Sequence, residues 1–264
     1  NLPQKQKYLK KVNYIMCDIS KKKNVTKSLK KNFDYVVNLG GHVNHKDKKK
    51  TYNTHYIGCK NLVNFFLKKK LRSFIQIGSS SEYGLHKAPH KESFKCKPVS
   101  TYGKSKLLSS TYLVKLFKEK KFPATILRFY QVYGPKQDLN RFLPVVISGC
   151  LKNKKFPCSH GTQTRDFLHI NDAVEAIFKS IKSKNTKGKI FNIGTGKPIL
   201  IKKIINMIQV KTKGGKPLFG KINLRKEESL KSYPDINESK KKLGWIPKVN
   251  FLKGLDLTIK SYYN

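Results

Sequence analysis

Arginine, acidic residues and cysteine are all scarce in this chain of 264 residues. Asp and Glu number 15 against 57 Lys and Arg, so the formal net charge is +42. Only five of the basic residues are arginine: Arg72, Arg128, Arg141, Arg165 and Arg225. Proteins that recognise nucleic acid specifically cluster their basic residues and use arginine, whose forked guanidinium matches phosphate and guanine. Lysines spread along the whole chain instead predict a solvated surface with weak, salt-sensitive binding to polyanions and no specific nucleic-acid partner.

The five cysteines are widely spaced, odd in number and form no C-x-x-C pair; they are Cys17, Cys59, Cys96, Cys150 and Cys158. This usage argues against a disulfide framework and a zinc site, and it favours a reducing, cytoplasmic location. The seven histidines also lack metal-ligand spacing, and we interpret His42 and His45 as polar loop residues. No metal site is expected.

Long apolar runs are absent as well. None approaches the ~18 residues that a membrane-spanning helix needs, so no membrane partner is expected. Apolar residues still make up 38% of the chain, which is enough for a sizeable core.

Short apolar runs bounded by turn-forming residues predict strands at 12–18, 34–39, 73–78, 124–129 and 189–193. Helices are expected at 24–31, 51–70, 100–120, 171–182 (with Asn171 as the N-cap), 237–243 and 252–262. Strands that are apolar throughout and alternate with helices are typical of a parallel sheet covered on both faces. The predicted fold class is therefore α/β, with a doubly wound parallel sheet.

Two segments, 134–161 and 196–264, are richer in loop, Pro and Gly. We interpret them as a smaller substrate-binding lobe, and residues 1–133 and 162–195 as a Rossmann-like cofactor-binding domain. The lobe is expected to lie over the carboxyl edge of the sheet, where open α/β sheets bind their ligands.

The most informative group of residues is G-S-S-S-E-Y-G at 78–84, after a strand, followed by Tyr102 and Lys106 on a helix. Tyr and Lys four apart share one helix face. A neighbouring ammonium stabilises a phenolate, so we expect Lys106 to lower the pKa of Tyr102. With a Ser hydroxyl to hold a substrate oxygen, these residues meet the needs of an acid/base that serves hydride transfer at a carbinol carbon. The Tyr–Lys pair alone is weak evidence for such a catalytic site, because a Lys-rich chain contains this spacing by chance. The preceding strand and its Ser-rich turn strengthen the prediction.

Further motifs follow in order: RFYQVYGP at 128–135, GTQTRDFLHIND at 161–172, FNIGTG at 191–196 and LGWIP at 243–247. With 78–84 and 102–106, they resemble the NAD-dependent epimerase/dehydratase branch of the extended short-chain dehydrogenases over nearly the whole chain. The resemblance implies NAD or NADP as cofactor, a nucleoside-diphosphate sugar as substrate and a homodimer. We interpret Gly194–Gly196 as a tight turn and not as a phosphate loop.

The resemblance also implies roles for single residues. Ser79 and Tyr102 would be catalytic, and Lys106 would be catalytic and bind the nicotinamide ribose. The other cofactor contacts would be Asp18, Ile19, Leu39, Gly40, Gly41 and Phe129. The substrate contacts would be Gln131, where the family usually has Asn, and Arg141, Arg165 and Arg225 at the diphosphate. A chain that uses Lys almost everywhere keeps Arg where a fork must bind phosphate; Arg128 is instead expected to pair within the strand edge.

Two departures from the family pattern stand out. The G-x-x-G-x-x-G fingerprint, which cradles the pyrophosphate at a helix N-terminus, is missing upstream of residues 12–18. We therefore expect that the chain begins partway through the cofactor-binding domain, with the first β-α unit missing, and the choice between NAD and NADP stays open. His55 stands where the family usually has Asn.

The reaction expected first is 4-epimerisation or 4-keto reduction, with 4,6-dehydration as the alternative within the family. Family dehydratases place a Glu two residues before the Tyr of the Y-G pair, often after an Asp. Here those positions are Ser81 and Ser80, and Glu82 comes one residue later. A one-residue shift on an extended segment turns a side chain to the opposite face, unless a bulge or turn brings it back. A non-catalytic relative that binds nucleotide-sugar, and a polyanion binder supported by charge alone, are the alternatives from other classes.

Overall fold

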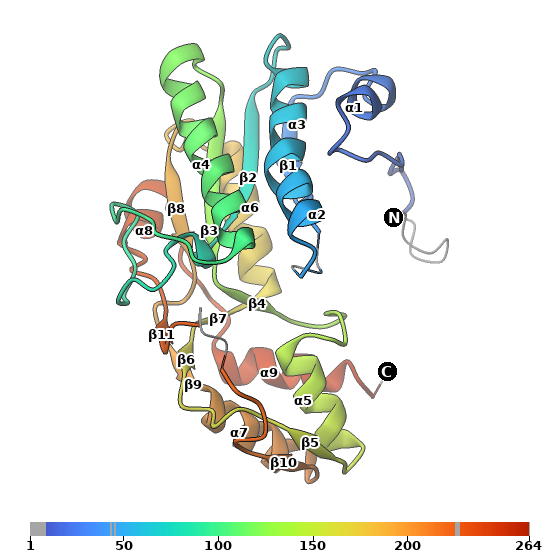
Figure 1. The fold of residues 1–264 in the computed structure, drawn as a ribbon, viewed down its shortest axis with the longest axis vertical. Coiled ribbons are helices and arrows are strands. Elements are labelled where there is room, and N and C mark those ends of the chain that lie inside the picture. The colour runs from blue at the N-terminus through green and yellow to red at the C-terminus, as the bar shows by residue number, and fades with distance from the viewer. Residues whose placement is uncertain (1–8, 43, 45, 225–227, 264) are drawn as a thin grey trace.

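The computed structural model describes residues 9–42, 44, 46–224 and 228–263, and a four-stranded parallel sheet lies at its centre (Figure 1). The strands are β1 (Tyr35–Asn38), β2 (Ser73–Ser79), β3 (Ala124–Phe129) and β8 (Ile190–Ile193), in the spatial order β1-β2-β3-β8. Every neighbouring pair in this sheet is parallel. The strands expected at 34–39, 73–78, 124–129 and 189–193 are confirmed to within a residue at either end.

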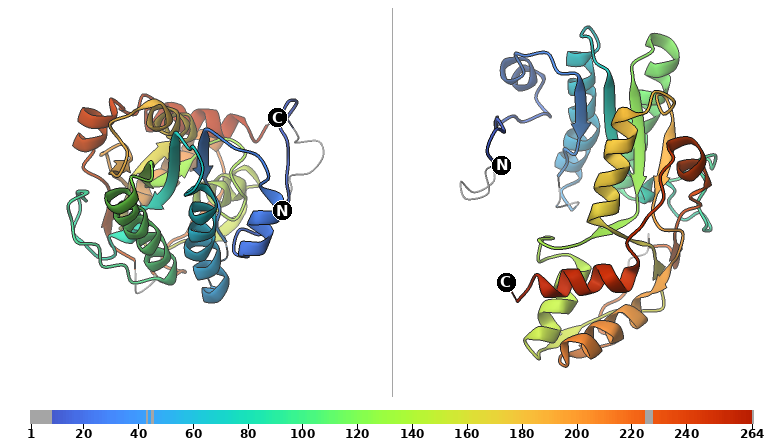
Figure 2. Two further views of the ribbon diagram at one scale, coloured as in Figure 1. Left: turned by 90° about the horizontal axis from the view of Figure 1, so that it is seen from above. Right: turned by 180° about the vertical axis from the view of Figure 1, so that it is seen from behind.

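Helices cover both faces of this sheet (Figure 2). One face carries α3 (Gly58–Phe66) and α4 (Thr101–Lys120), and the other carries α6 (Ile170–Lys182). Because side chains alternate along a strand, Phe74 packs in the cluster beneath α3 and α4 while Ile75 packs in the cluster beneath α6. This two-sided burial is the reason why β2 and β3 are apolar throughout, and it confirms the doubly wound α/β class.

The strand expected at 12–18 is wrong. These residues form no strand in the structure, and Val12 and Ile15 are about half exposed. A strand exists only where a neighbour completes its ladder of backbone hydrogen bonds. Residues 12–18 lie outside the sheet, and among the described residues β1 pairs only with β2. The apolar pattern was correct for a strand, but no partner lies beside it.

A continuous helical stretch precedes β2. It consists of α2 (Lys48–Tyr52), a π-helical turn η2 (Asn53–Ile57) and α3, which ends at Phe66. The shorter α1 (Lys22–Ser28) packs against α3. The helix at 171–182 is confirmed as α6, but Asn171 is not its N-cap. The N-cap is His169, whose Nδ1 accepts a hydrogen bond from the backbone N–H of Asn171. An imidazole thus takes the capping position that sequence preference gave to Asn.

The elements beyond the carboxyl edge of the sheet contain more helix than the sequence indicated. They include α5 (Phe142–Leu151), α7 (Ile201–Thr212), α8 (Asn237–Leu243) and α9 (Phe251–Lys260). Pro144 lies in the first turn of α5, where its missing N–H has no helical partner to lose. Short strands connect these helices to the sheet: β4 (Gln131–Tyr133) with β7 (Phe167–His169), β5 (Lys155–Pro157) with β10 (Lys216–Leu218), and β6 (Thr164–Arg165) with β9 (Ile199–Leu200) and β11 (Lys231–Ser232).

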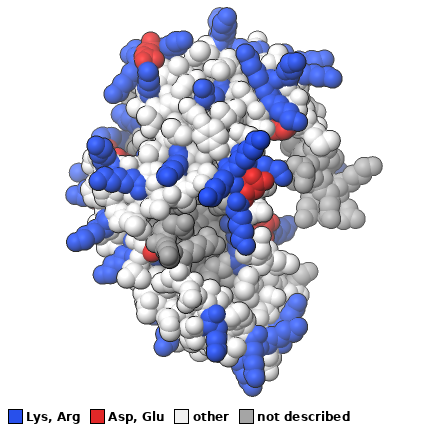
Figure 3. Space-filling view, viewed as in Figure 1, with Lys and Arg blue, Asp and Glu red and all other residues white. Residues whose placement is uncertain are grey.

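These elements have a hydrophobic core of their own, in which Ile147 of α5 and Ile204 and Ile208 of α7 are fully buried. We propose the domain division on this basis, with 134–161 and 196–264 as the substrate-binding lobe. Lys and Arg lie all around the outline of the face in Figure 3, with few acidic residues between them. Among the described residues, no helix combines the length and apolarity that crossing a membrane requires.

Candidate active site

A pocket of about 590 Å³ lies between the carboxyl edge of the sheet and the smaller lobe. The cofactor-binding domain contributes Ser80, Ser81, Gln131 and Arg165, and the lobe contributes Glu228. Apolar walls come from residues that include Phe142, Val146, Phe156, Ile201 and Ile205. About half of the lining residues are polar, so the pocket offers many hydrogen-bonding groups between its apolar walls.

Ser79 is held by the 3₁₀ turn η3 (Ser80–Glu82) that follows β2. Its Oγ accepts a hydrogen bond from Ser81 N at 3.2 Å, and Glu82 Oε1 accepts one from Ser79 N at 2.9 Å. This is the reciprocal capping box that the sequence S-x-x-E encodes. The Ser-rich turn therefore fixes both the backbone and the hydroxyl of Ser79.

Tyr102 lies in the first turn of α4, whose N-cap is Ser100. The helix start is packed tightly on the Ser-rich turn, since a Cβ added at Gly103 would stand 2.4 Å from Ser81 O. Burial raises the pKa of Tyr102, a hydrogen bond with the Ser79 side chain lowers it, and the charges of Glu82 and Arg141 act in opposite directions. Ser79 and Tyr102, 23 residues apart in sequence, thus meet at one point.

Lys106 follows Tyr102 by one helical turn and is 4% exposed. Its Nζ donates a hydrogen bond to Ile77 O at 2.7 Å and lies 5.7 Å from the centroid of the Tyr102 ring. Burial lowers the pKa of Lys106 to about 8. The expected lowering of the pKa of Tyr102 by Lys106 is wrong for this structure: burial dominates at Tyr102, and the Lys106 ammonium is directed at the backbone of β2.

The residues expected at the cofactor lie around the end of β1. Asp18 accepts hydrogen bonds from Ser20 N and Ser20 Oγ, and the Ser20 hydroxyl contributes most to lowering the pKa of Asp18. The Ile19 side chain packs so closely on Gly40 that a Cβ there would stand 2.5 Å from it. Leu39 is 69% exposed.

An exposed Leu39 and an ionised Asp18, which can accept from hydroxyls, fit the adenosine side of a dinucleotide. Phe129 ends β3 and is buried. These residues would hold the cofactor as the sequence predicts, and that role stays a proposal.

His55, which stands where the family usually has Asn, lies next to the proposed acid/base Tyr102. The π-helical turn η2 carries His55, and its ring meets that of Tyr102 edge to face with centroids 5.0 Å apart. His55 Nε2 lies 3.3 Å from His42 O. π-helical turns inside α-helices are frequent at functional sites.

The substrate residues expected from sequence are only partly brought together. Gln131 and Arg165 line the pocket, and Arg165 Nη2 forms an ion pair with Glu228 Oε1 at 2.5 Å. Arg141 precedes α5 and is exposed, and its positive charge lowers the pKa of Tyr102, against the larger effect of burial. Arg225 lies outside the described residues. Sequence reasoning did not identify Glu228, which carries no motif signal of its own.

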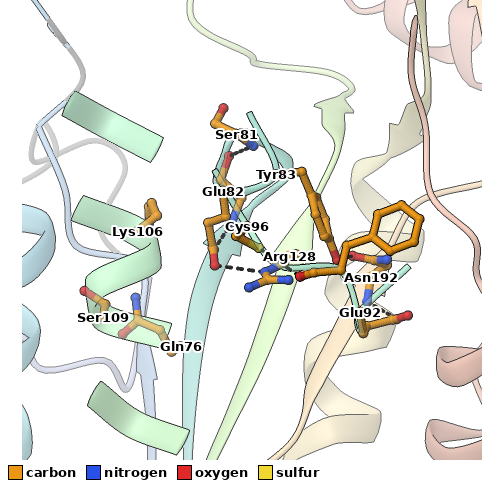
Figure 4. Close-up of polar contacts among 12 residues, drawn as sticks. Gln76, Ser81, Glu82, Tyr83, Glu92, Cys96, Lys106, Ser109, Arg128 and Asn192 are labelled. Atoms are coloured by element: carbon orange, nitrogen blue, oxygen red, sulfur yellow. Dashed lines mark hydrogen bonds and ion pairs between the residues drawn. The ribbon is translucent and has the colours of Figure 1, made fainter. Parts of the chain in front are cut away.

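Arg128 pairs within the interior, as expected. Its Nε lies 2.8 Å from Glu82 Oε2, and the two side chains are 2% and 0% exposed. The guanidinium lies over the Tyr83 ring, whose hydroxyl donates to Asn192 Oδ1 at 2.7 Å (Figure 4). Glu82 therefore faces β3 and away from the substrate pocket. Sequence reasoning left this point open, because only the position of Arg128 across the sheet decides it.

A doubly wound parallel sheet with Ser, Tyr and Lys gathered beside a pocket at its carboxyl edge defines the class of the extended short-chain dehydrogenases. The model of the NAD dependent epimerase/dehydratase family matches residues 1–194, and the chain belongs to this family. Its members and relatives include nucleotide-sugar epimerases and dehydratases.

Two curated relatives illustrate this range. The chain is 32% identical over 221 residues to a dTDP-D-glucose 4,6-dehydratase of Bos taurus, which covers 80% of this chain and 60% of the relative. It is 30% identical over 172 residues to a putative UDP-glucose 4-epimerase of Methanocaldococcus jannaschii, with 63% of this chain and 54% of the relative covered. The chain thus spans 60% and 54% of the length of these two relatives.

Solved structures show the same fold. A UDP-glucuronic acid 4-epimerase from Bacillus cereus, in complex with UDP-glucuronic acid and NAD, superposes with a TM-score of 0.82 at 27% identity, covering 93% of this chain and 78% of that chain. A UDP-glucose 4-epimerase from Thermotoga maritima with UDP-glucose gives a TM-score of 0.84 at 24% identity, over 93% and 82% of the two chains.

Proposed function

We propose that the protein modifies a nucleoside-diphosphate sugar in an NAD(P)-dependent reaction, by 4-epimerisation or by reduction of a 4-keto sugar. The observation that carries the proposal is the meeting of Ser79, Tyr102 and Lys106. Their chain neighbours Ser80 and Ser100 line the pocket, and so does Arg165. The pocket volume of about 590 Å³ suits a ligand the size of a nucleotide-sugar.

In the proposed reaction, the Ser79 hydroxyl holds the oxygen on C4 of the sugar. Tyr102 takes the proton from this oxygen on oxidation and returns it on reduction. Lys106 holds the nicotinamide ribose. The bound nicotinamide supplies a hydride acceptor or donor at C4. A Tyr102 whose pKa is raised by burial stays protonated at neutral pH, which is the form that a keto reduction uses.

The arginines position the other end of the substrate. Arg165 is buried at the pocket wall, where its guanidinium pairs with Glu228. In the proposed complex the phosphate takes the place of this carboxylate, because a planar guanidinium binds phosphate in pairs of hydrogen bonds. We assign Arg165 to the diphosphate, together with Arg141 and Arg225. Gln131, also at the pocket, is assigned to the sugar.

Dehydration across C5 and C6 needs a base for a carbon-bound proton. Among the described residues that line the pocket, the carboxylate is Glu228, which pairs with Arg165, and the Ser-rich turn contributes only hydroxyls. Ser80 and Ser81 line the pocket, and a hydroxyl does not remove such a proton unaided. Glu82, the neighbouring carboxylate, is buried against Arg128 and Ser79 N. These contacts support epimerisation or reduction over 4,6-dehydration, even though dehydratases are among the curated relatives.

The test is a thermal-shift screen with UDP-, GDP-, CDP- and dTDP-sugars, followed by turnover assays with NAD and NADP for epimerisation and with NADH and NADPH for reduction of a 4-keto sugar. A ligand at about 100 times its Kd stabilises by about 2.7 kcal/mol, which is about 5–10 °C for a protein of this size. One nucleotide class should give such a shift and then be converted to product. Arg165→Lys, which keeps the charge but loses the fork, should reduce the shift.

The rival classes predict other results. A non-catalytic relative would bind a nucleotide-sugar and convert none. A polyanion binder would be stabilised by heparin as strongly as by any nucleotide-sugar, and the effect would disappear when the salt concentration is raised from about 50 to 200 mM. Either result would contradict the proposed function.

A further inference from the structure

The carboxylate of Glu82 connects two parts of the interior behind the site. Its Oε2 accepts a hydrogen bond from Arg128 Nε at 2.8 Å, and its Oε1 accepts one from Ser79 N at 2.9 Å. Both charged side chains are almost wholly buried. One side chain thus joins the middle of the sheet to the Ser-rich turn, as Figure 4 shows.

Stability alone does not explain a buried ion pair at this position. Removing two charges from water is costly, and well-packed apolar residues of similar volume are often as stabilising or more so. The sheet is nevertheless shaped to admit the pair. A Cβ at Gly78 would stand 2.7 Å from Glu82 Oε1 and 3.1 Å from Arg128 Cγ, so glycine leaves the space that the carboxylate crosses.

The consequence for Ser79 is a defined direction for its hydroxyl. Glu82 holds the backbone N–H of Ser79, and Ser79 Oγ accepts the N–H of Ser81. With an incoming donor fixed on one side of Oγ, the Ser79 hydroxyl is directed to the side where Tyr102 lies.

We propose that Glu82, held in place by Arg128, is a positioning residue that orients Ser79 and thereby sets the geometry of proton transfer between Tyr102 and the substrate. This inference rests on the proposed function, in which Ser79 and Tyr102 act on the sugar hydroxyl.

The charge of Glu82 adds a second, measurable effect. It raises the pKa of both Tyr102 and Lys106, although burial is the larger influence on each. The Glu82 carboxylate therefore acts on all three residues of the proposed site: it accepts a hydrogen bond from Ser79 N, and its charge raises the pKa of Tyr102 and of Lys106.

Three double variants separate the acceptor from the charge. Glu82→Gln/Arg128→Gln removes both charges but keeps a carbonyl oxygen that accepts from Ser79 N. Glu82→Met/Arg128→Met has a similar volume and no acceptor. Asp34→Asn/Arg72→Gln is the matched control, because it removes an exposed ion pair with an Nε–Oδ1 distance of 3.0 Å at the start of β1.

We expect kcat of Glu82→Met/Arg128→Met to fall about 10- to 100-fold with KM changed less than about threefold, since small misplacements of catalytic groups cost rates of this order. Glu82→Gln/Arg128→Gln should regain most of kcat, with its pH–rate profile shifted from that of the parent. The control should behave as the parent. A folded methionine variant with parental kcat, or a glutamine variant as slow as the methionine variant, overturns the proposal.

Gly78→Ala provides an independent variant, because the added methyl group displaces the carboxylate without changing any charge. If the double variants do not fold, the same loss of kcat at constant KM is required of Gly78→Ala, and parental kcat there overturns the proposal.

Hydrogen exchange of the Ser79 amide gives a readout that needs no turnover. Its protection should fall at least about tenfold in the methionine variant and persist in the glutamine variant, because only the first loses the acceptor. A parent protein that converts no nucleotide-sugar refutes the proposed function, whereas unchanged Ser79 exchange in the methionine variant refutes the role of Glu82.

Discussion

The rings of His55 and Tyr102 meet edge to face, with the ring centroids 5.0 Å apart and the ring planes at 78°. His55 is 6% exposed, and a Cβ at Gly41 would stand 2.0 Å from its ring atom Cε1. The imidazole is therefore enclosed between the end of β1 and the proposed acid/base. It follows that the position of Tyr102 depends on the absence of a side chain at residue 41.

Gly41→Ala should consequently push His55 toward Tyr102. We expect a loss of about 1–3 kcal/mol in the free energy of unfolding, the usual cost of overpacking an interior. Urea denaturation measures it. Gly41→Ala/His55→Ala is the matched partner, because removing the ring restores the space, so the alanine at 41 should cost much less in that background. Equal costs in the two backgrounds would show that the contact does not constrain the site.

Tyr102→Phe keeps the ring and removes the proton. Turnover of a nucleotide-sugar should fall by about 10²–10⁴-fold, the usual contribution of general acid–base catalysis, with little change in substrate affinity. Steady-state kinetics and calorimetry measure the two quantities. Tyr112→Phe is the control: Tyr112 is on the same helix, with its hydroxyl 3.2 Å from Asn64 Oδ1 and remote from the pocket. A Tyr102→Phe variant near the parental rate would remove Tyr102 from the mechanism.

Lys106 should make stability depend on pH in the alkaline range. Its pKa falls from 10.5 to about 8 on folding because the ammonium is buried, so the folded state binds this proton less tightly than the unfolded state. Burial of Lys106 therefore opposes folding below pH 8, and this penalty disappears as the pH rises to 10.5. The free energy of unfolding of the parent, minus that of Lys106→Met, should rise by on the order of 3 kcal/mol across this window. A difference that stays flat with pH would contradict the buried ammonium.

Periodicity and local chemistry predicted much of this fold. The strands at 73–78 and 124–129 were readable because both of their faces are buried, which makes them apolar throughout. The helix at 100–120 was readable from Ser100, which caps it by accepting from Gly103 N. The helix α5 was missed because Pro144 and Gly149 suggest a loop, although Pro144 lies in the first turn, where it is tolerated.

The rest depended on contacts between distant segments. Residues 12–18 have the composition of a strand, but a strand needs a neighbour that composition does not reveal. Sequence left open whether Glu82 reaches the pocket, and its partner Arg128, 46 residues away, decides this. The expected direction of the pKa shift of Tyr102 is wrong because burial, which sequence spacing does not show, dominates at Tyr102. Spacing also does not show that Lys106 Nζ bonds to Ile77 O.

The proposed reaction is tested most directly by the mass of the product. The protein is incubated with NAD or NADP and, separately, with UDP-, GDP-, CDP- and dTDP-hexoses. In a parallel reaction it is incubated with a nucleoside-diphosphate 4-keto sugar and NADH or NADPH, which supplies the hydride. The intact nucleotide-sugars are then analysed by chromatography and mass spectrometry. Because Ser80 and Ser81 face the pocket and Glu82 is buried against Arg128, the account predicts one of two outcomes: a new isomer of unchanged mass from a hexose, or a product with two more hydrogens from the 4-keto sugar. Loss of one water from an intact nucleotide-hexose would show that the protein is a dehydratase and would contradict the account.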